Sequence, residues 1–142
     1  EIGISATATE GLYLNDREVA IRGYYFGTTI SSNGCKRAFY VADSGVLVLD
    51  GITVSNMGRC GTDDCNGGAI YLAYGGVFAG YLANFVDCTA CGSGGAIYGE
   101  EYTLIELRAD STFTRNKANV SGGAIYLKDY SRTWEETVCL LT

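Results

Sequence analysis

The sequence of 142 residues contains no proline and no histidine. Proline lacks a backbone N–H, so its absence favours a fold in which most backbone donors join a hydrogen-bonded ladder. No window approaches the roughly 18 apolar residues that a membrane-spanning helix needs, so we expect no membrane span. Residues 1–8 also lack the basic-then-apolar pattern of a signal peptide, which leaves either a mature secreted form or a cytosolic protein.

Basic residues are scarce. Ten Lys and Arg oppose 16 Asp and Glu, which gives a net charge of −6 and a pI of about 4.5. A nucleic-acid partner would require a basic stripe, so we expect none. Apolar residues make up 47% of the chain, which excludes disorder, and the length suits one domain over residues 1–142.

The most informative feature is a repeated motif. Gly-Gly-Ala-Ile-Tyr begins at residues 67, 94 and 122, so its copies start 27 and then 28 residues apart. A fixed period in this range is typical of a solenoid, in which each repeat forms one coil. The length allows about four to five coils. The segment 128–142 departs from the repeat, which predicts a cap or a contact surface for another subunit.

Short apolar runs separated by turn residues predict strands rather than helices, with three strands in each triangular coil. Alternation within the motif places the isoleucines on one face and the tyrosines on the other. We expect two ladders inside the coil. The first consists of Ile70, Ile97 and Ile125, and the second of Val54, Phe85 and Phe113.

Two motifs near the end of the chain carry a family resemblance. Phe113-Thr-Arg-Asn116 and Gly122-Gly-Ala-Ile resemble the FxxN and GGA[ILV] repeats of chlamydial-type polymorphic outer membrane proteins. The wider pattern is similar to that of the pectin-lyase-like superfamily. The resemblance implies an all-β fold, a short right-handed parallel β-helix. This fold carries lyases, hydrolases, adhesins and structural fibres, so it implies no single function. Cys88 and Met57 stand where Asn116 stands in its own repeat, so a stacked asparagine ladder is incomplete.

Six cysteines are present, an even number in a chain without histidine, which indicates disulfides and an oxidising, extracellular or cell-surface location. They are Cys35, Cys60, Cys65, Cys88, Cys91 and Cys139. A zinc site would need the middle four together, and the glycine-rich context favours disulfides instead, so we expect no metal and no cofactor.

Six cysteines allow 15 pairings, and the sequence does not choose among them. Cys60 or Cys65 paired with Cys88 or Cys91 would join adjacent coils, which lie about 4.8 Å apart. Cys35 and Cys139 belong to opposite ends of the stack. They could pair only if the tail folds back, or between stacked subunits.

Catalytic residues are harder to find. Enzymes of the resembled superfamily use clustered aspartates with Ca²⁺, or paired aspartates with histidine, and the second arrangement is impossible here. Asp63-Asp64 is the only adjacent pair. It is interpreted as a solvated loop tip, and we expect no enzyme, although a polysaccharide lyase or hydrolase remains an alternative.

Two surface features remain. Tyr71, Tyr98 and Tyr126 recur once per coil and should form an outward stripe. The stripe either stabilises the parallel sheet or contacts sugar rings or a neighbouring subunit. Asn119-Val120-Ser121 is an N-glycosylation sequon, expected to be exposed and modified only in a eukaryotic source.

The leading hypothesis is a secreted structural subunit of an extracellular or cell-surface fibre or coat. It would form a homopolymer by end-to-end stacking, because open sheet edges pair unless they are capped. The alternative is an adhesin-like module that binds glycans through the tyrosine stripe. A polysaccharide-active enzyme fragment is the third reading.

Overall fold

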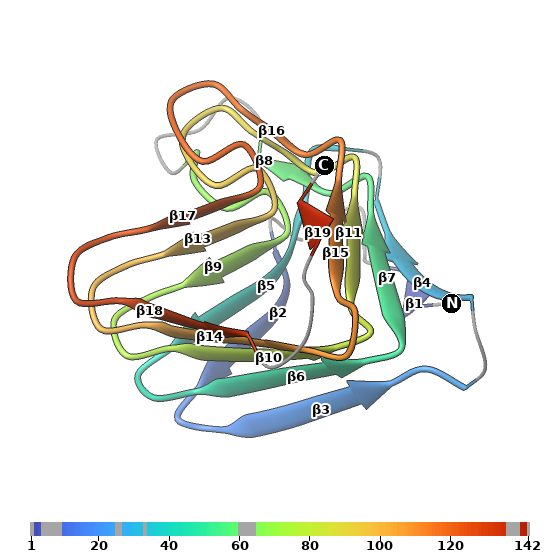
Figure 1. The fold of residues 1–142 in the computed structure, drawn as a ribbon, viewed down its shortest axis with the longest axis horizontal. Coiled ribbons are helices and arrows are strands. Elements are labelled where there is room, and N and C mark those ends of the chain that lie inside the picture. Colours follow the sequence, from blue (N-terminus) through green and yellow to red (C-terminus); the bar gives the residue numbers. More distant parts are fainter. Residues whose placement is uncertain are drawn as a thin grey trace.

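The computed structural model describes residues 2–3, 10–24, 27–32, 34–59, 65–135 and 140–141. The predictions for Cys60, Cys139 and the Asp63-Asp64 pair fall outside these residues. The described chain is all-β, and its parallel strands stack as a solenoid of about four turns, which confirms the predicted fold class (Figure 1).

Four parallel sheets run along the stack, each built from successive coils. Sheet A contains β1 (Ile2–Gly3), β4 (Thr28–Ser31), β7 (Ile52–Ser55), β11 (Asn84–Val86), β15 (Thr112–Thr114) and β19 (Leu140–Leu141). Sheet B contains β2 (Glu10–Asn15), β5 (Arg37–Ala42), β9 (Ile70–Leu72), β13 (Ile97–Gly99) and β17 (Ile125–Leu127). Sheet C contains β3 (Glu18–Arg22), β6 (Val46–Asp50), β10 (Val77–Tyr81), β14 (Leu104–Arg108) and β18 (Arg132–Glu135). Sheet D contains β8 (Gly58–Arg59), β12 (Thr89–Ala90) and β16 (Lys117–Ala118).

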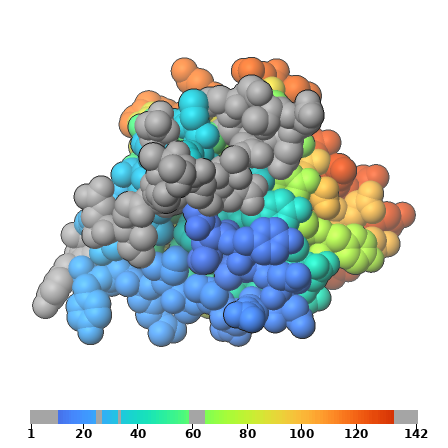
Figure 2. Space-filling view, turned by 180° about the vertical axis from the view of Figure 1, so that it is seen from behind, coloured from blue at the N-terminus to red at the C-terminus, as the bar shows by residue number. Residues whose placement is uncertain are grey.

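Two details go beyond the sequence prediction. The coil has three main sides, as expected, but the short sheet D adds a fourth strand at one corner. The segment 128–142, whose sequence departs from the repeat, contributes β18 and β19, which continue sheets C and A. Figure 1 is seen from the C-terminal end of the stack. Figure 2 shows the opposite end, where the first coil lies at the surface.

Both predicted ladders lie inside the coil. Ile70 and Ile97 are paired in register and fully buried, whereas Ile125 in the last coil is partly buried. Phe85 and Phe113 are fully buried, and their rings stack with centroids 4.9 Å apart. Burying side chains of this size contributes about 1.5–3 kcal/mol each, so these ladders hold neighbouring coils together.

The glycine pair of the repeat is required by the backbone. Gly67, Gly94 and Gly122 have φ of 66°, 68° and 62°, a left-handed region that favours glycine. A Cβ atom on Gly94 would also collide with the carbonyl oxygen of Ile97. The motif therefore encodes a tight corner that leads directly into the strand carrying the isoleucine ladder.

Candidate functional site

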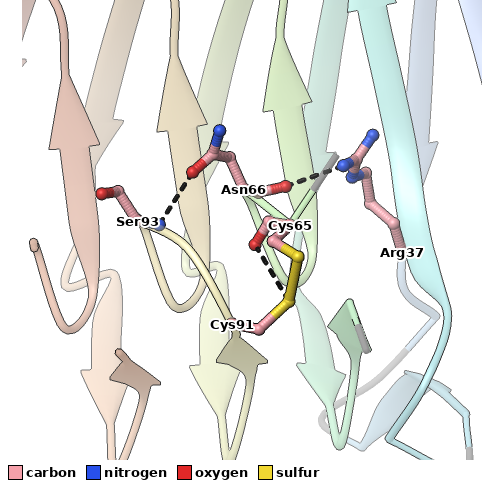
Figure 3. Close-up of a disulfide and its surroundings, with 5 residues drawn as sticks. All are labelled: Arg37, Cys65, Asn66, Cys91 and Ser93. Atoms are coloured by element: carbon pink, nitrogen blue, oxygen red, sulfur yellow. Dashed lines mark hydrogen bonds between the residues drawn. A yellow bond between two sulfur atoms is a disulfide. The ribbon is translucent and has the colours of Figure 1, made fainter. Parts of the chain in front are cut away.

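A disulfide joins two adjacent coils at the corner that precedes sheet B (Figure 3). Cys65 and Cys91 are 26 residues apart in sequence, and their Cα atoms are 5.0 Å apart. Two hydrogen bonds also join these coils next to the disulfide. The Gly92 N–H donates to the Cys65 carbonyl oxygen at 2.9 Å. The Ser93 N–H donates to Oδ1 of Asn66 at 2.8 Å. The corner is thus fixed by the disulfide and by hydrogen bonds between the two coils.

Replacing both cysteines of this bridge with serine should lower the free energy of unfolding by about 2–3 kcal/mol, because the bridge restricts the unfolded chain. Urea denaturation of the Cys65→Ser/Cys91→Ser protein measures the loss. Digestion of the unmodified protein without reductant provides the control, since it should release one linked pair of peptides containing these two cysteines. Equal midpoints for the two proteins would contradict the expected role.

The other described cysteines differ in environment. Cys35 is exposed. Cys88 is not part of a disulfide, and its thiol is fully buried among core side chains. Burial raises the pKa of this thiol to about 12, so it stays protonated and unreactive at neutral pH. Asn116 lies in the same register position one coil later, where Oδ1 accepts a hydrogen bond from the Cys88 N–H at 2.9 Å.

A buried arginine supports the disulfide corner. Arg37 begins β5 and has no exposed surface. Its Nε donates to the Gly67 carbonyl oxygen at 3.0 Å. Its Nη2 donates to the Asn66 carbonyl oxygen at 2.7 Å (Figure 3). The guanidinium carbon lies 4.7 Å from the centre of the Tyr71 ring, within cation–π range. Sequence reasoning missed this residue, and its one signal is a basic side chain at the start of an apolar strand.

The predicted tyrosine stripe lies on the outer face of sheet B and is longer than expected. Five rings follow one another with centroids 4.9 to 5.4 Å apart, and they belong to Tyr13, Tyr40, Tyr71, Tyr98 and Tyr126. The two central rings are covered, since Tyr71 is 8% and Tyr98 is 5% exposed. These two rings therefore offer little surface to a sugar or a neighbouring subunit.

Hydroxyl contacts tie the stripe to the following coil. The Tyr71 hydroxyl donates to Oε1 of Glu100 at 2.5 Å. Burial raises the pKa of Tyr98, although a hydrogen bond with Lys128 partly opposes the shift, and the same bond raises the pKa of Lys128. Each of these tyrosines thus packs against its own sheet and bonds to the next coil.

A second set of tyrosines is exposed. Tyr74, Tyr102 and Tyr130 lie at the corner between sheets B and C, with exposed fractions of 59%, 52% and 74%. Neighbouring centroids are 5.2 Å apart in both pairs. The sequence signal was available, because these tyrosines follow one another at intervals of 28 residues. The sequence analysis considered only the tyrosines of the repeated motif and so did not identify this second set.

The exposed tyrosines border the outer face of sheet C. A shallow hollow of about 590 Å³ lies there, and Tyr102 and Tyr130 form one side of it. Leu104, Glu106 and Arg132 form much of the rest. The hollow therefore combines aromatic, aliphatic and charged surface on the last two coils of the sheet.

Other predicted sites are less informative. Asn119 is exposed, as expected for a sequon residue, and its N–H bonds to the Ala90 carbonyl oxygen at 3.1 Å. Among the described residues, no group of three or more His, Cys, Asp or Glu side chains could hold a metal ion. The same part of the chain contains no helix that is long and apolar enough to cross a membrane.

Comparison with known proteins gives one match. Residues 110–128 match the Chlamydia polymorphic membrane protein repeat. Neither the curated proteins nor the solved structures give a match. In the structure the matched residues run from the turn before β15, through β16 and the Gly122-Gly123 corner, to the end of β17. The protein is thus a parallel β-solenoid of about four turns that carries a repeat of the Chlamydia polymorphic membrane protein type.

Proposed function

We propose that the protein is a structural subunit of a cell-surface fibre or coat and that it assembles by stacking solenoids end to end. The matched repeat takes its name from membrane proteins of Chlamydia, which supports a place at a cell surface. The geometry supports the mode of assembly, because the strands at the two ends of sheets B and C are complementary in register.

The first support for this stacking is the register of the strands in sheet B. Within the sheet, Leu12 occupies the isoleucine column and Tyr13 occupies the tyrosine column. Placing β2 of a second copy on β17 would set Leu12 against Ile125 and Tyr13 against Tyr126, so both ladders would continue across the junction. The junction would add one more coil to the pattern that the chain itself repeats.

The end coils also expose apolar surface that the middle coils bury. Leu12 is 37% and Tyr13 is 57% exposed. Ile125 is partly buried, whereas its neighbour Ile97 in the preceding coil is fully buried. Covering these side chains with another coil would remove apolar surface from water, which favours association.

Charge supports the same register in sheet C. Glu18 in β3 and Arg132 in β18 occupy one column of that sheet, and both are exposed. Stacking β3 of a second copy on β18 would place this carboxylate beside this guanidinium. Opposite charges at a junction favour the matching register over others.

Assembly can be measured by negative-stain electron microscopy and sedimentation velocity over a range of protein concentrations. We expect filaments of uniform width for the unmodified protein. Glu18→Arg and Arg132→Glu should each shorten or abolish them, because each single change places like charges together at the junction. The double variant should restore assembly, since the pair is re-formed with its charges exchanged.

The control for these variants is Glu101→Arg, which reverses an exposed charge on a middle coil and should leave filaments unchanged. Discrete particles of one chain at every concentration would refute end-to-end stacking. Adding reductant to assembled material tests whether Cys35 contributes a covalent link between subunits, as the sequence suggested.

The exposed tyrosine corner favours a second candidate, an adhesin-like module that binds glycans. Tyr74, Tyr102 and Tyr130 supply aromatic surface and hydroxyl groups, and the adjoining hollow supplies Glu106 and Arg132. Under this candidate, retention on immobilised glycans should fall when Tyr102 is changed to serine. Tyr71→Ser should have no specific effect on retention, because the Tyr71 ring is covered.

A further inference from the structure

The outer faces of sheets A and C differ in composition. Sheet A presents mostly hydroxyl and amide side chains to the outside, including Thr53, Ser55, Asn84, Thr112 and Thr114. Sheet C presents aliphatic side chains on its three middle strands, namely Val46, Val48, Val77, Ala79 and Leu104. The inner faces of both sheets are apolar. Sheet C therefore carries an apolar patch on its outer face as well, and this patch is bordered by Asp50, Tyr81, Glu106 and Arg108.

A sheet with one face in water normally alternates apolar and polar residues, as sheet A does, whereas a sheet that is apolar on both faces is normally covered on both. Among the described residues, the strands of sheet C pair only with one another, and no other sheet lies outside them. Figure 1 shows the same arrangement, with the face between β3 and β18 directed away from the other sheets. The composition of this outer face therefore indicates that a binding partner covers it.

The charges at the margins of this face indicate what the partner is. Glu18 and Arg132 lie at opposite ends of the column that also contains Val46, Val77 and Leu104. Asp50 and Arg108 lie on either side of Tyr81 in a parallel column. In the first column the acid is at the N-terminal end of the stack and the base at the C-terminal end. In the second column Asp50 precedes Arg108 by two strands, and Arg22 of β3 lies beyond Asp50 and pairs with it at 3.7 Å. The face is thus complementary to a reversed copy of itself.

We propose that a second copy of this chain covers the outer face of sheet C, related by a two-fold axis that runs parallel to the strands. The solenoid axes of the two copies are then antiparallel, and β10 lies opposite β10 of the second copy. Val46 meets Leu104, and Asp50 meets Arg108. The contact is isologous, because each residue pair occurs twice.

The other face-to-face two-fold arrangement is unfavourable. An axis parallel to the solenoid axis would exchange the two outer columns, so Val46 would face Asp50 and Leu104 would face Arg108. That arrangement buries charge against aliphatic side chains, which costs free energy. The antiparallel arrangement has one such residue pair, Glu106 against Val48, which the two-fold axis repeats. Glu106 keeps its own ion pair with Arg108 at 3.4 Å.

The size of the patch sets the expected strength. Five strands about 4.8 Å apart, with three outward residues on the first four and two on β18, cover only about 300 Å² on each copy. Stable dimers bury roughly 800 Å² on each partner, so one such contact should be weak, with a Kd in the micromolar to millimolar range. Solenoids stacked end to end would repeat the contact along their length and strengthen it by multivalency.

Cysteine cross-linking tests the axis directly. Because β10 faces itself, Val77→Cys should give a covalent dimer linked through residue 77 under mild oxidation or with a short thiol cross-linker. Thr53→Cys, on the polar outer face of sheet A, is the matched control and should not exceed the background from the native cysteines. Peptide mapping that finds no 77–77 link would overturn the proposed axis.

Sedimentation equilibrium tests the energetics on the same middle coils, away from the ends where filament contacts would form. Val77→Lys should raise the Kd of the dimer at least about tenfold, and Thr53→Lys should leave it unchanged. Asp50→Arg or Arg108→Asp alone should weaken the dimer, and the double variant should recover it. A dimer insensitive to these changes, or a monomer at every concentration, would overturn the proposal. Neither result depends on whether filaments form.

Discussion

Replacing Phe85 with alanine should lower the free energy of unfolding by about 3–5 kcal/mol. Phe85 is fully buried, stacks on Phe113 with centroids 4.9 Å apart and meets the edge of Phe78 at 5.7 Å. The smaller side chain would leave a cavity between two coils that are joined by short strands, and the neighbouring rings cannot fill it without losing their own contacts. Urea or thermal denaturation followed by circular dichroism measures the loss.

The matched control for this variant is Val86→Ala, because Val86 follows Phe85 in β11 and points outward. Its loss should be well below that of Phe85→Ala, at about 1 kcal/mol or less. If both variants lost similar stability, the phenylalanine ladder would not be the main link between these coils.

The second large effect is expected from Arg37→Met, at about 3 kcal/mol. The guanidinium is buried and donates to the carbonyl oxygens of Asn66 and Gly67, so its removal leaves two acceptors without these donors. Methionine retains part of the side-chain volume but supplies no hydrogen bond. Denaturant unfolding measures the loss of stability, and hydrogen exchange at Gly67 and Gly68 should accelerate because the corner is no longer held.

Arg22→Met is the control, because the Arg22 side chain is 73% exposed and its ion pair with Asp50 is long, at 3.7 Å. It should change the free energy of unfolding by no more than about 0.5 kcal/mol. An equally small effect at Arg37 would show that its hydrogen bonds are replaced by other donors, and the corner would then owe its order to the disulfide.

The interior was predictable because two periods agree in this sequence. Alternation within a strand assigns Ile70 and Phe85 to the inside, and the repeat of 27 to 28 residues aligns each with its neighbours. The same alignment placed Cys88 at the level of Asn116, which the register confirms. The sequence therefore predicts which residues of neighbouring coils lie in register, as long as each coil has the same corners.

The exterior was less predictable because alternation does not say what covers an outward side chain. Tyr98 and Tyr102 both point away from the core, yet Tyr98 is 5% and Tyr102 is 52% exposed. Part of the difference comes from Lys128 of the next coil, which bonds to the Tyr98 hydroxyl. The choice of Cys65 as the partner of Cys91 has a similar origin, since it depends on how two corners of unequal length come together.

The bridge between Cys65 and Cys91 also has a mechanical consequence. Along the stack, adjacent coils are joined by backbone hydrogen bonds and by contacts with nearest neighbours, so tension applied along this axis would load the junctions in series. Such a rod yields first at its weakest junction and peels from there. The disulfide prevents the junction between its two coils from separating, so rupture would begin at a junction nearer the ends of the stack. The coils around β9 and β13 would remain together after their neighbours had parted.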